Sequence, residues 1–301
     1  MSAEQVSRPG RGIFWMVVTG LLFVGVTAMV KIMGTRIPAA ESAFLRYVLG
    51  LVFLIPMLRP MMRAPLTPRL WGLFALRGGV HTIGVVCWFF AMARIPMADV
   101  TAINYLSPIY VTLGAAVFLG ERLALRRVLA ILIALVGALI ILRPGFREIG
   151  TGHMAMMVTA LFFGASYLLA KRGTQEVSPI VVVGMLSITV TIGLAPLAAA
   201  VWITPTAFEL AMLFGVACLA TVGHYTMTLA FSSAPLAVTQ PMVFLQLVWA
   251  VTMGAVVFGE GVDPYVILGG MIIIASVSFI SWRESVLKRK NVTPSVHQTK
   301  V

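Results

Sequence analysis

Apolar residues fill long runs along this chain, and short polar segments separate them. The hydrocarbon core of a bilayer is about 30 Å thick, so a helix needs about 20 consecutive apolar residues to cross it. Runs of that size recur ten times, which predicts an all-α membrane protein with ten transmembrane helices. The expected helices cover residues 13–33, 39–58, 70–92, 97–119, 124–143, 152–171, 179–202, 207–231, 235–258 and 264–283.

Composition supports lipid as the surrounding solvent. Of 301 residues, 60% are hydrophobic and 11% are charged, whereas a soluble domain carries about 25% charged residues. Cys87 and Cys218 both lie in apolar runs. Two cysteines are too few for a disulfide scaffold or a zinc site, so we expect membrane-buried thiols, no metal and no cofactor.

Positive charge predicts the orientation of the chain. Counted over the N-terminus, the even-numbered loops and the C-terminus there are fifteen Lys and Arg residues, against five on the odd-numbered loops. Cytoplasmic segments carry the excess of Lys and Arg. We therefore expect a multi-pass protein of the inner (plasma) membrane with both termini in the cytoplasm. The net charge of +12 is dispersed over short loops, so nucleic-acid binding is not expected.

An internal repeat divides the chain into two halves. Shifting the sequence by about 140 residues places Thr19 on Thr159 and Phe23 on Phe163, and a Pro…Gly-Glu pattern recurs in both halves. The expected units are an N-terminal tail (1–12), a first five-helix repeat (13–143), a second repeat (152–283) and a basic C-terminal tail (284–301). Five is an odd number, so the second repeat is predicted to be inverted. Inverted repeats are typical of carriers that hold substrate in a central cavity between the repeats and work by alternating access.

Two motifs carry a family resemblance. The stretch ADVTAINYLSP at 98–108 is followed by Gly-Glu-Arg at 120–122, and a weaker copy surrounds Pro235 and the Gly-Glu pair at 259–260. Over residues 12–283 the chain resembles the EamA-type drug/metabolite transporter superfamily. The resemblance implies a ten-helix carrier fold. Members include exporters of amino acids, some of them aromatic amino acids, carriers of vitamin-like metabolites and importers of S-adenosylmethionine. The resemblance therefore does not identify the substrate.

Polar and aromatic side chains inside the apolar runs are the candidate site. Polar groups are costly in a membrane and default to functional roles, and aromatic rings beside a few hydrogen-bonding groups suit an amphipathic organic solute. His81 and His224 lie on matching faces of helices that correspond in the two repeats, which suggests one shared cavity. The alternative is that each imidazole ring forms a hydrogen bond with a backbone carbonyl in a packed bundle. The expected cavity-lining residues are His81, Trp88, Asn104, Tyr105, Phe163, Tyr167, His224, Phe244 and Trp249.

Two prolines and two arginines inside the runs raise further hypotheses. Pro108 frees the carbonyl of Asn104 and acts either as a hinge or as a packing kink, and Pro241 is its asymmetric counterpart. Arg46 and Arg77 are intramembrane charges that break the repeat symmetry. Arg46 should find a partner on another helix or in the carboxylate of a substrate.

Two structural contacts are also expected. Glu260 ends a helix, where its charge opposes the macrodipole, so it should have a partner. A seam of small residues within 130–138 should contact another helix, with Gly269-Gly270 as its partner surface or with a second copy of the chain. The chain is expected to be a monomer or a homodimer.

Secondary transport of a small organic solute is the function that these features favour. No GxxxxGK[ST] loop is present for ATP hydrolysis, and no HExxH or GxSxG motif for catalysis, so an enzyme is not expected. Aromatic and histidine residues in the predicted cavity favour export of aromatic or other hydrophobic amino acids. Cofactor-like metabolites such as S-adenosylmethionine or riboflavin are the alternative substrates.

Overall fold

The computed structural model describes residues 9–107, 109–110, 125–143, 148–173, 176–233 and 243–292. Throughout these residues the regular structure is helical, without strands. Six segments, in α1, α2 with η1, α4, α8, α9 and α10, are long and apolar enough to cross a membrane. The helices are α1 (Pro9–Met33), α2 (Ala39–Gly50), the 3₁₀ helix η1 (Leu51–Met57), α3 (Leu58–Arg63), α4 (Pro68–Met92), α5 (Met97–Asn104), α7 (Leu125–Leu142), α8 (Thr151–Gly173), α9 (Pro179–Ala199), α10 (Ala207–Ser233), α12 (Val243–Phe258) and α13 (Pro264–Val292).

Proline and glycine set the helix ends. Pro68 opens α4, and the hydroxyl of Thr67 accepts a 3.3 Å hydrogen bond from the Leu70 amide. This is favourable because the first turn of a helix has amides without intrahelical partners. After α1 and α12, Gly34 and Gly259 adopt φ values of +73° and +64°. Only glycine takes this left-handed conformation without strain, so both helices stop there.

Several boundaries differ from those predicted. The run 39–58 is an α-helix only to Gly50 and continues as η1, which contains Pro56; a proline lacks the amide that an α-helix needs. At the other end of the chain, α13 continues to Val292. The segment 284–292, expected to belong to an unstructured tail, is therefore helical.

The helix expected over residues 97–119 is interrupted before Pro108. Helix α5 ends at Asn104, and the amides of Tyr105 and Leu106 bond to carbonyls three residues back. The role of Pro108 as a hinge or a packing kink stays a prediction. Pro108 and Pro241 themselves lie outside the described residues.

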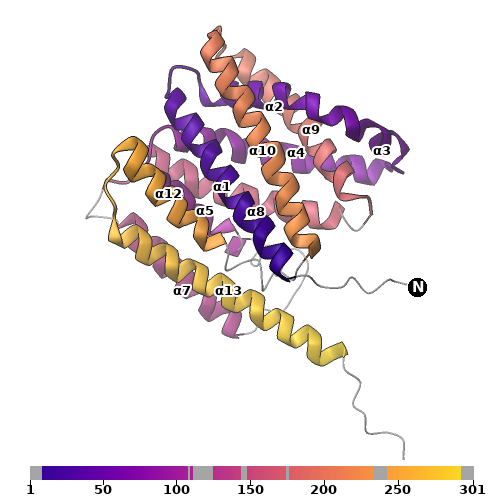
Figure 1. Ribbon diagram of the computed structural model, residues 1–301. Helices are drawn as coiled ribbons and strands as arrows, with labels where there is room; N and C mark the ends of the chain where they lie inside the picture. The colour runs from indigo at the N-terminus through magenta and orange to yellow at the C-terminus, as the bar shows by residue number, and fades with distance from the viewer. Residues whose placement is uncertain are drawn as a thin grey trace, which may run out of the picture.

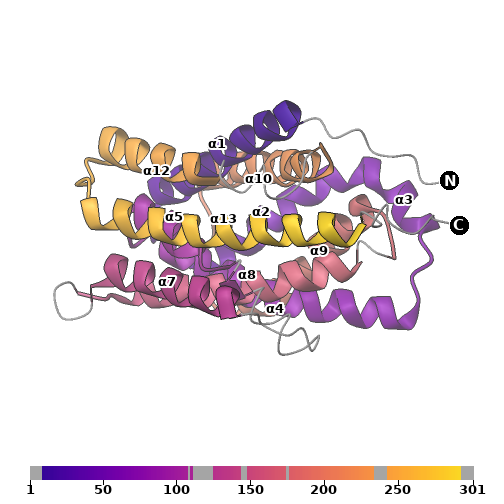
Figure 2. The same cartoon turned by 90° about the horizontal axis from the view of Figure 1, so that it is seen from below.

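Helices from the two parts of the chain pack against each other in a single bundle. Helix α1 packs along α10, and α4 packs along α8 (Figure 1). Helices α7 and α13 form a pair at the lower edge of the bundle in Figure 1, and Figure 2 shows α13 running across the front of the molecule seen from below. Each of these contacts joins residues before 144 to residues after 148, so the halves interleave.

The predicted small-residue seam is the α7–α13 contact. A Cβ atom on Gly137 would lie 2.8 Å from the carbonyl oxygen of Gly269, and Ala134 is fully buried. The two backbones therefore approach as closely as their glycines allow. Gly270 faces Leu247 instead, so only the first glycine of the pair belongs to this seam.

The outer surface of the bundle is apolar. On α7, Leu132, Ile133, Val136 and Leu139 are all exposed. A row of exposed leucine, isoleucine and valine side chains is unfavourable in water, and it is the expected surface where lipid tails are the solvent.

Candidate functional site

A buried histidine links three helices in the middle of the bundle. His81 of α4 is 4% exposed. Its Nδ1 atom lies 3.1 Å from the hydroxyl of Ser166 on α8, and its Nε2 atom lies 3.1 Å from the hydroxyl of Tyr47 on α2. Both ring nitrogens thus have side-chain partners. The partners of His81 are therefore hydroxyl groups rather than backbone carbonyls.

Aromatic rings surround this histidine. Phe163 stacks on His81 with ring centroids 4.8 Å apart, and Trp88 packs edge-on against Phe163 at 5.8 Å. Phe23 of α1 continues the cluster, 6.4 Å from Trp88 and 5.2 Å from His224. Helices α1, α4, α8 and α10 all contribute, so both halves of the chain build this aromatic cluster. Four of its members, His81, Trp88, Phe163 and His224, were predicted from the sequence.

Two glycines make room for the rings. A Cβ atom on Gly84 would lie 2.8 Å from Cδ1 of Phe163, and one on Gly223 would lie 3.3 Å from Cε2 of Phe23. Phe23 and Phe163 are repeat counterparts, as are Gly84 and Gly223. The same phenylalanine–glycine contact therefore occurs twice, once between α1 and α10 and once between α8 and α4.

Threonine hydroxyl groups form hydrogen bonds beside both of these glycines. Thr159 donates a 3.2 Å hydrogen bond to the Gly84 carbonyl. Its counterpart Thr19 lies 2.8 Å, oxygen to oxygen, from Thr226, and Thr226 donates to the Gly223 carbonyl at 3.0 Å. Hydroxyl groups thus hold both helix pairs together beside the aromatic cluster.

Two arginines are buried next to this cluster. Arg46 and Arg77 are 7% and 6% exposed. Both lie close enough to His81 and His224 to interact with them electrostatically. The Nη1 atom of Arg77 donates a 2.8 Å hydrogen bond to the Val182 carbonyl of α9. The Arg46 guanidinium stacks 4.1 Å above the ring of its neighbour Tyr47. The expectation that Arg46 pairs with another helix is not met among the described side chains.

The remaining predicted residues fall into separate places. Tyr105 shares a hydrogen bond with the backbone of Leu247, and Asn104 accepts one from Ser107 at 3.2 Å. These contacts join α5 to α12 and to its own turn rather than to the aromatic cluster. Tyr167 lies 6.2 Å from Phe163 and is 37% exposed, so it belongs to the edge of the cluster.

Helix α12 contributes less than predicted. Trp249 is 36% exposed and has no ring contact with the aromatic cluster among the described side chains. Trp249 therefore lies apart from the aromatic cluster as described, and its place in the substrate cavity stays a prediction. Phe244 lies in α12, and its side chain is outside the described residues.

Tyr47 is the member of the site that sequence reasoning missed. It adjoins Arg46, and its hydroxyl is the partner of His81. The signal for it was indirect. A buried histidine needs partners for both nitrogens, and Tyr47 is the tyrosine nearest the intramembrane Arg46 in the sequence.

A second polar cluster closes one end of the bundle. We call this end, where α1 finishes and the loops 34–38, 93–96, 200–206 and 259–263 gather, the distal face. Here Lys31 of α1 forms a 2.7 Å ion pair with Glu260 and donates a 2.9 Å hydrogen bond to the Ile95 carbonyl. Glu260 also accepts a 3.0 Å hydrogen bond from the amide of Met97, at the start of α5. Glu260 therefore has the partner that its position predicted.

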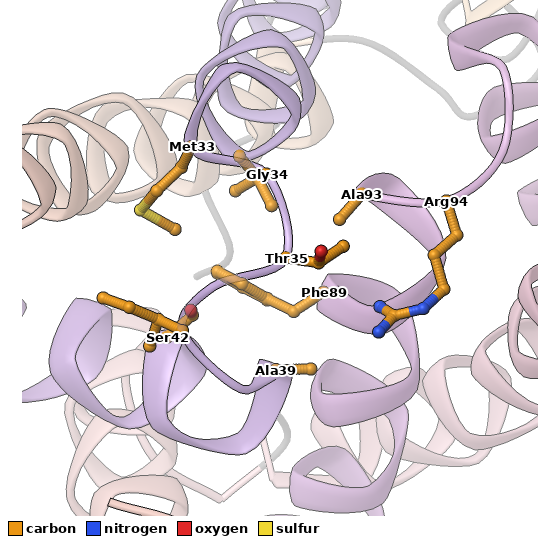
Figure 3. A pocket seen from close by; sticks show the side chains of 10 residues that line it. Met33, Gly34, Thr35, Ala39, Ser42, Phe89, Ala93 and Arg94 are labelled. Carbon is orange, nitrogen blue, oxygen red and sulfur yellow. The ribbon is translucent and has the colours of Figure 1, made fainter. Parts of the chain in front are cut away.

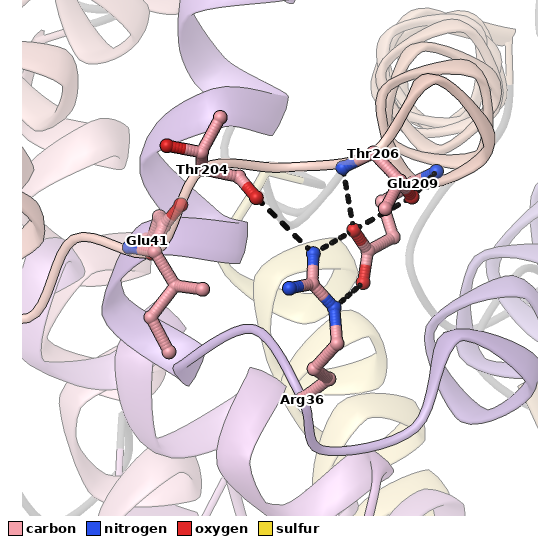
Figure 4. Close-up of polar contacts among 6 residues, drawn as sticks. Arg36, Glu41, Thr204, Thr206 and Glu209 are labelled. Atoms are coloured by element: carbon pink, nitrogen blue, oxygen red, sulfur yellow. Dashed lines mark hydrogen bonds and ion pairs between the residues drawn. The ribbon is translucent and has the colours of Figure 1, made fainter.

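The carboxylates of Glu209 and Glu41 also accept hydrogen bonds at the distal face (Figure 4). Glu209 accepts hydrogen bonds from Arg36 and from the Thr206 amide. The Glu41 carboxylate accepts a 2.8 Å hydrogen bond from the Ile203 amide. Each carboxylate thus ties a residue of one half to a residue of the other or orders the loop between α9 and α10.

One further ion pair and one hydrogen bond complete this set. Arg143 forms an ion pair with Asp263, and Nε2 of His153 lies 3.0 Å from the carboxylate of Asp99. Both again join residues of different halves. We refer to the ion pairs of Lys31, Arg36 and Arg143 and the His153–Asp99 hydrogen bond as the distal contacts.

A small surface pocket lies at the distal face, between α1, α2 and α4 (Figure 3). Phe89 and Ser42 line it, and Arg94 stands at its rim with its guanidinium 3.6 Å above the ring of Phe90. This pocket is distinct from the aromatic cluster around His81.

Comparison with known proteins agrees with this architecture. The model of the EamA-like transporter family matches residues 10–143 and, a second time, residues 150–282. The chain therefore belongs to the EamA-like transporter family and is a multi-pass membrane protein that transports a small molecule. The family expected from the motifs at 98–108 and 120–122 is confirmed.

Named relatives match along nearly the whole chain. A riboflavin transporter of Rhizobium johnstonii is 31% identical over 96% of this chain and 96% of its own. An S-adenosylmethionine uptake transporter of Rickettsia bellii is 26% identical over 93% of this chain and 97% of its own. A solved crystal structure shares the fold with a TM-score of 0.58 at 15% identity, covering 95% of this chain and 100% of that one.

Proposed function

We propose that this protein carries a planar, cofactor-like metabolite across the membrane, with riboflavin or a close analogue as the first candidate. The observation that carries this proposal is the aromatic cluster, in which rings from both halves surround the His81 hydrogen bonds. Aromatic faces beside a few hydrogen-bonding groups bind a flat heteroaromatic ring well. The riboflavin and S-adenosylmethionine relatives favour the same class of substrate.

Amino-acid export, the function first expected from the sequence, has less support. It rested on the aromatic and histidine content of the site, and that content suits a flavin equally well. The names of the relatives favour the cofactor-like alternative.

The proposed architecture is ten membrane-spanning helices arranged as two inverted repeats. The recurring phenylalanine–glycine contact supports it, since Phe163 with Gly84 repeats as Phe23 with Gly223. The repeat relates α1 to α8 and α10 to α4, so the packing of α1 on α10 corresponds to the packing of α8 on α4. With both termini in the cytoplasm, as the charge distribution favours, the distal face is the external one.

The position of the distal contacts supports a proposal of alternating access. Ion pairs that join the halves hold the external side shut, as with Lys31–Glu260 and Arg143–Asp263. A carrier in this state exposes its substrate site toward the cytoplasm, and transport requires the distal contacts to break. The two states then differ in which face of the interleaved halves is closed.

Counterflow in proteoliposomes tests this function. Vesicles preloaded with unlabelled riboflavin, S-adenosylmethionine, tryptophan or phenylalanine are diluted into the same labelled compound. Riboflavin is expected to accumulate transiently, and the amino acids are not. Exchange of tryptophan or phenylalanine without exchange of riboflavin would replace the proposed substrate by amino acids. Protein-free vesicles control for leakage.

A further inference from the structure

Arg46 and Arg77 place two positive charges in the interior of the bundle. Neither forms an ion pair with a carboxylate in the part of the chain that the structure describes. The buried acidic side chains of that part, Glu41, Asp99 and Glu209, belong to the contacts of the distal face. The region around the aromatic cluster is therefore electropositive.

The guanidinium of Arg77 also keeps unused hydrogen-bonding capacity. Its Nη1 atom donates to the Val182 carbonyl, and its Nε atom is buried with no hydrogen-bond partner. An unpartnered donor on a buried charge is expensive unless a ligand satisfies it. Arg77 precedes His81 by one helical turn on α4, so both side chains lie on the same face of that helix.

The two arginines also lie on helices that are not repeat counterparts of each other. Their counterparts in the second half are Leu186 and Val216, both buried and apolar. A purely structural charge in a two-fold scaffold has no reason to occur on one side only, whereas a ligand without two-fold symmetry does. The asymmetry therefore favours a role in recognising one end of a substrate.

We propose that Arg46 and Arg77 determine charge specificity: the site accepts a planar heteroaromatic solute that is neutral or negatively charged and rejects a positively charged one. This inference rests on the proposed substrate site around His81. Two positive charges in a low-dielectric interior repel a cation strongly and attract an electron-rich carbonyl or a carboxylate. A flavin ring, with its carbonyl oxygens, fits this field. The sulfonium and ammonium groups of S-adenosylmethionine do not.

Three indole compounds of matched size test the charge preference directly. Indole-3-propionate is an anion, indole-3-propionamide is neutral and tryptamine is a cation, and all three present the same ring. Ligand-induced thermal stabilisation is measured with the full-length protein in an uncharged detergent. The concentration for half-maximal stabilisation is expected to be about tenfold lower for the anion than for the cation, the factor of a single charged hydrogen bond.

Variants separate recognition from folding. Arg77→Gln and Arg46→Gln, made singly, should each reduce the anion–cation difference, and Arg77→Lys should retain most of it because the charge remains. Arg69→Gln, on the exposed first turn of the same α4 helix, should leave the preference unchanged. Monodispersity on size-exclusion chromatography identifies the variants that fold.

Three results would overturn the inference: equal half-maximal concentrations for anion and cation in the unmodified protein, no stabilisation by any of the three compounds, or an unchanged preference in folded Arg77→Gln and Arg46→Gln. A wrong proposed function would give a different result in these experiments. If the charge preference is present and riboflavin does not exchange, riboflavin is not the substrate and the charge specificity stands.

Discussion

Lys31 and Glu260 form a 2.7 Å ion pair between the end of α1 and the loop after α12, although they are far apart in the sequence. Glu260 uses its second oxygen to accept the Met97 amide. One carboxylate thus holds a cation of the first half and the first turn of α5. The Gly-Glu motif that marks this position is therefore a contact between halves, and Gly259 supplies the left-handed turn that presents the glutamate.

Removing the charge of Glu260 should open the distal face. Glu260→Gln can still accept the Met97 amide and loses the ion pair with Lys31. A hydrogen bond to a charged group contributes about 1.5 kcal/mol, so the open population should rise about tenfold. In a background in which Cys87 and Cys218 are replaced by alanine, Ser42→Cys is buried in the distal pocket. Its labelling by a membrane-impermeant maleimide from the external side should accelerate accordingly.

Arg94→Gln is the matched control for this experiment. Arg94 lies at the same face, and its guanidinium contacts the ring and carbonyl of Phe90 in the last turn of α4. Labelling of Ser42→Cys should therefore be unaffected by this substitution. Equal labelling rates in Glu260→Gln and the parent would contradict the gating role of the ion pair.

The Arg36–Glu209 pair should be asymmetric in its effect on stability. Glu209 is buried and also accepts the Thr206 amide at 2.7 Å and the Thr206 hydroxyl at 2.8 Å, whereas Arg36 is largely exposed. Glu209→Gln weakens all of these bonds, and Arg36→Gln removes a solvent-screened pair whose loss costs about 1 kcal/mol or less.

Thermal unfolding in detergent, with the double variant included, measures this difference. The melting temperature should fall more for Glu209→Gln than for Arg36→Gln, and the double variant should fall by less than the sum of the two. A larger loss from Arg36→Gln, or additive losses, would show that the loop after α9 does not depend on Glu209.

The sequence predicted most of the fold, because hydropathy and helix punctuation are local properties. Apolar length gave the runs, and Pro68 and Gly259 lie at helix ends for reasons visible in the chain. The repeat also paired Phe23 with Phe163 correctly. Contacts between halves are a different matter. That Glu260 meets Lys31, or that His81 meets Tyr47, depends on how helices pack in three dimensions, and no local pattern encodes it.

The burial of the predicted site residues differs for the same reason. Trp249 and Phe163 look alike in the sequence, since each is an aromatic residue in an apolar run. Phe163 is buried because Gly84 leaves space on the facing helix, and Trp249 is partly exposed. Burial of an aromatic residue therefore depends on the partner surface, which the sequence of its own helix does not contain.

Gly84 should be essential where Gly79, on the same helix, is not. A Cβ atom on Gly84 would lie 2.8 Å from Phe163, whereas one on Gly79 would meet nothing within 4 Å. Gly84→Ala should displace the Phe163 ring from His81 at a cost of about 1–3 kcal/mol and reduce riboflavin exchange. Gly79→Ala should be neutral or raise stability by about 0.5–1 kcal/mol, because alanine favours helix.

Exchange rates and melting temperatures of the two alanine variants, made in parallel, check this prediction. The result to look for is a difference between the variants. Similar behaviour of both would mean that the close approach of α4 and α8 does not position the ring.

His81 allows the hydrogen bonds of the site to be separated from its ring stacking. His81→Phe keeps a ring against Phe163 and leaves the buried hydroxyls of Tyr47 and Ser166 without their partner. An unsatisfied buried group costs about 1–3 kcal/mol, so the single variant should unfold at a lower temperature. The triple variant Tyr47→Phe, His81→Phe, Ser166→Ala removes those hydroxyls as well. It should regain stability relative to His81→Phe, because no polar group is then left unpaired.

Transport should not recover with stability. If the hydroxyl and imidazole groups bind the substrate, the triple variant will be folded and inactive in riboflavin counterflow. A triple variant that exchanges riboflavin at the parental rate would limit these three residues to packing. One that is less stable than His81→Phe would contradict the hydrogen-bond geometry, since removal of both partners would then cost more than removal of one.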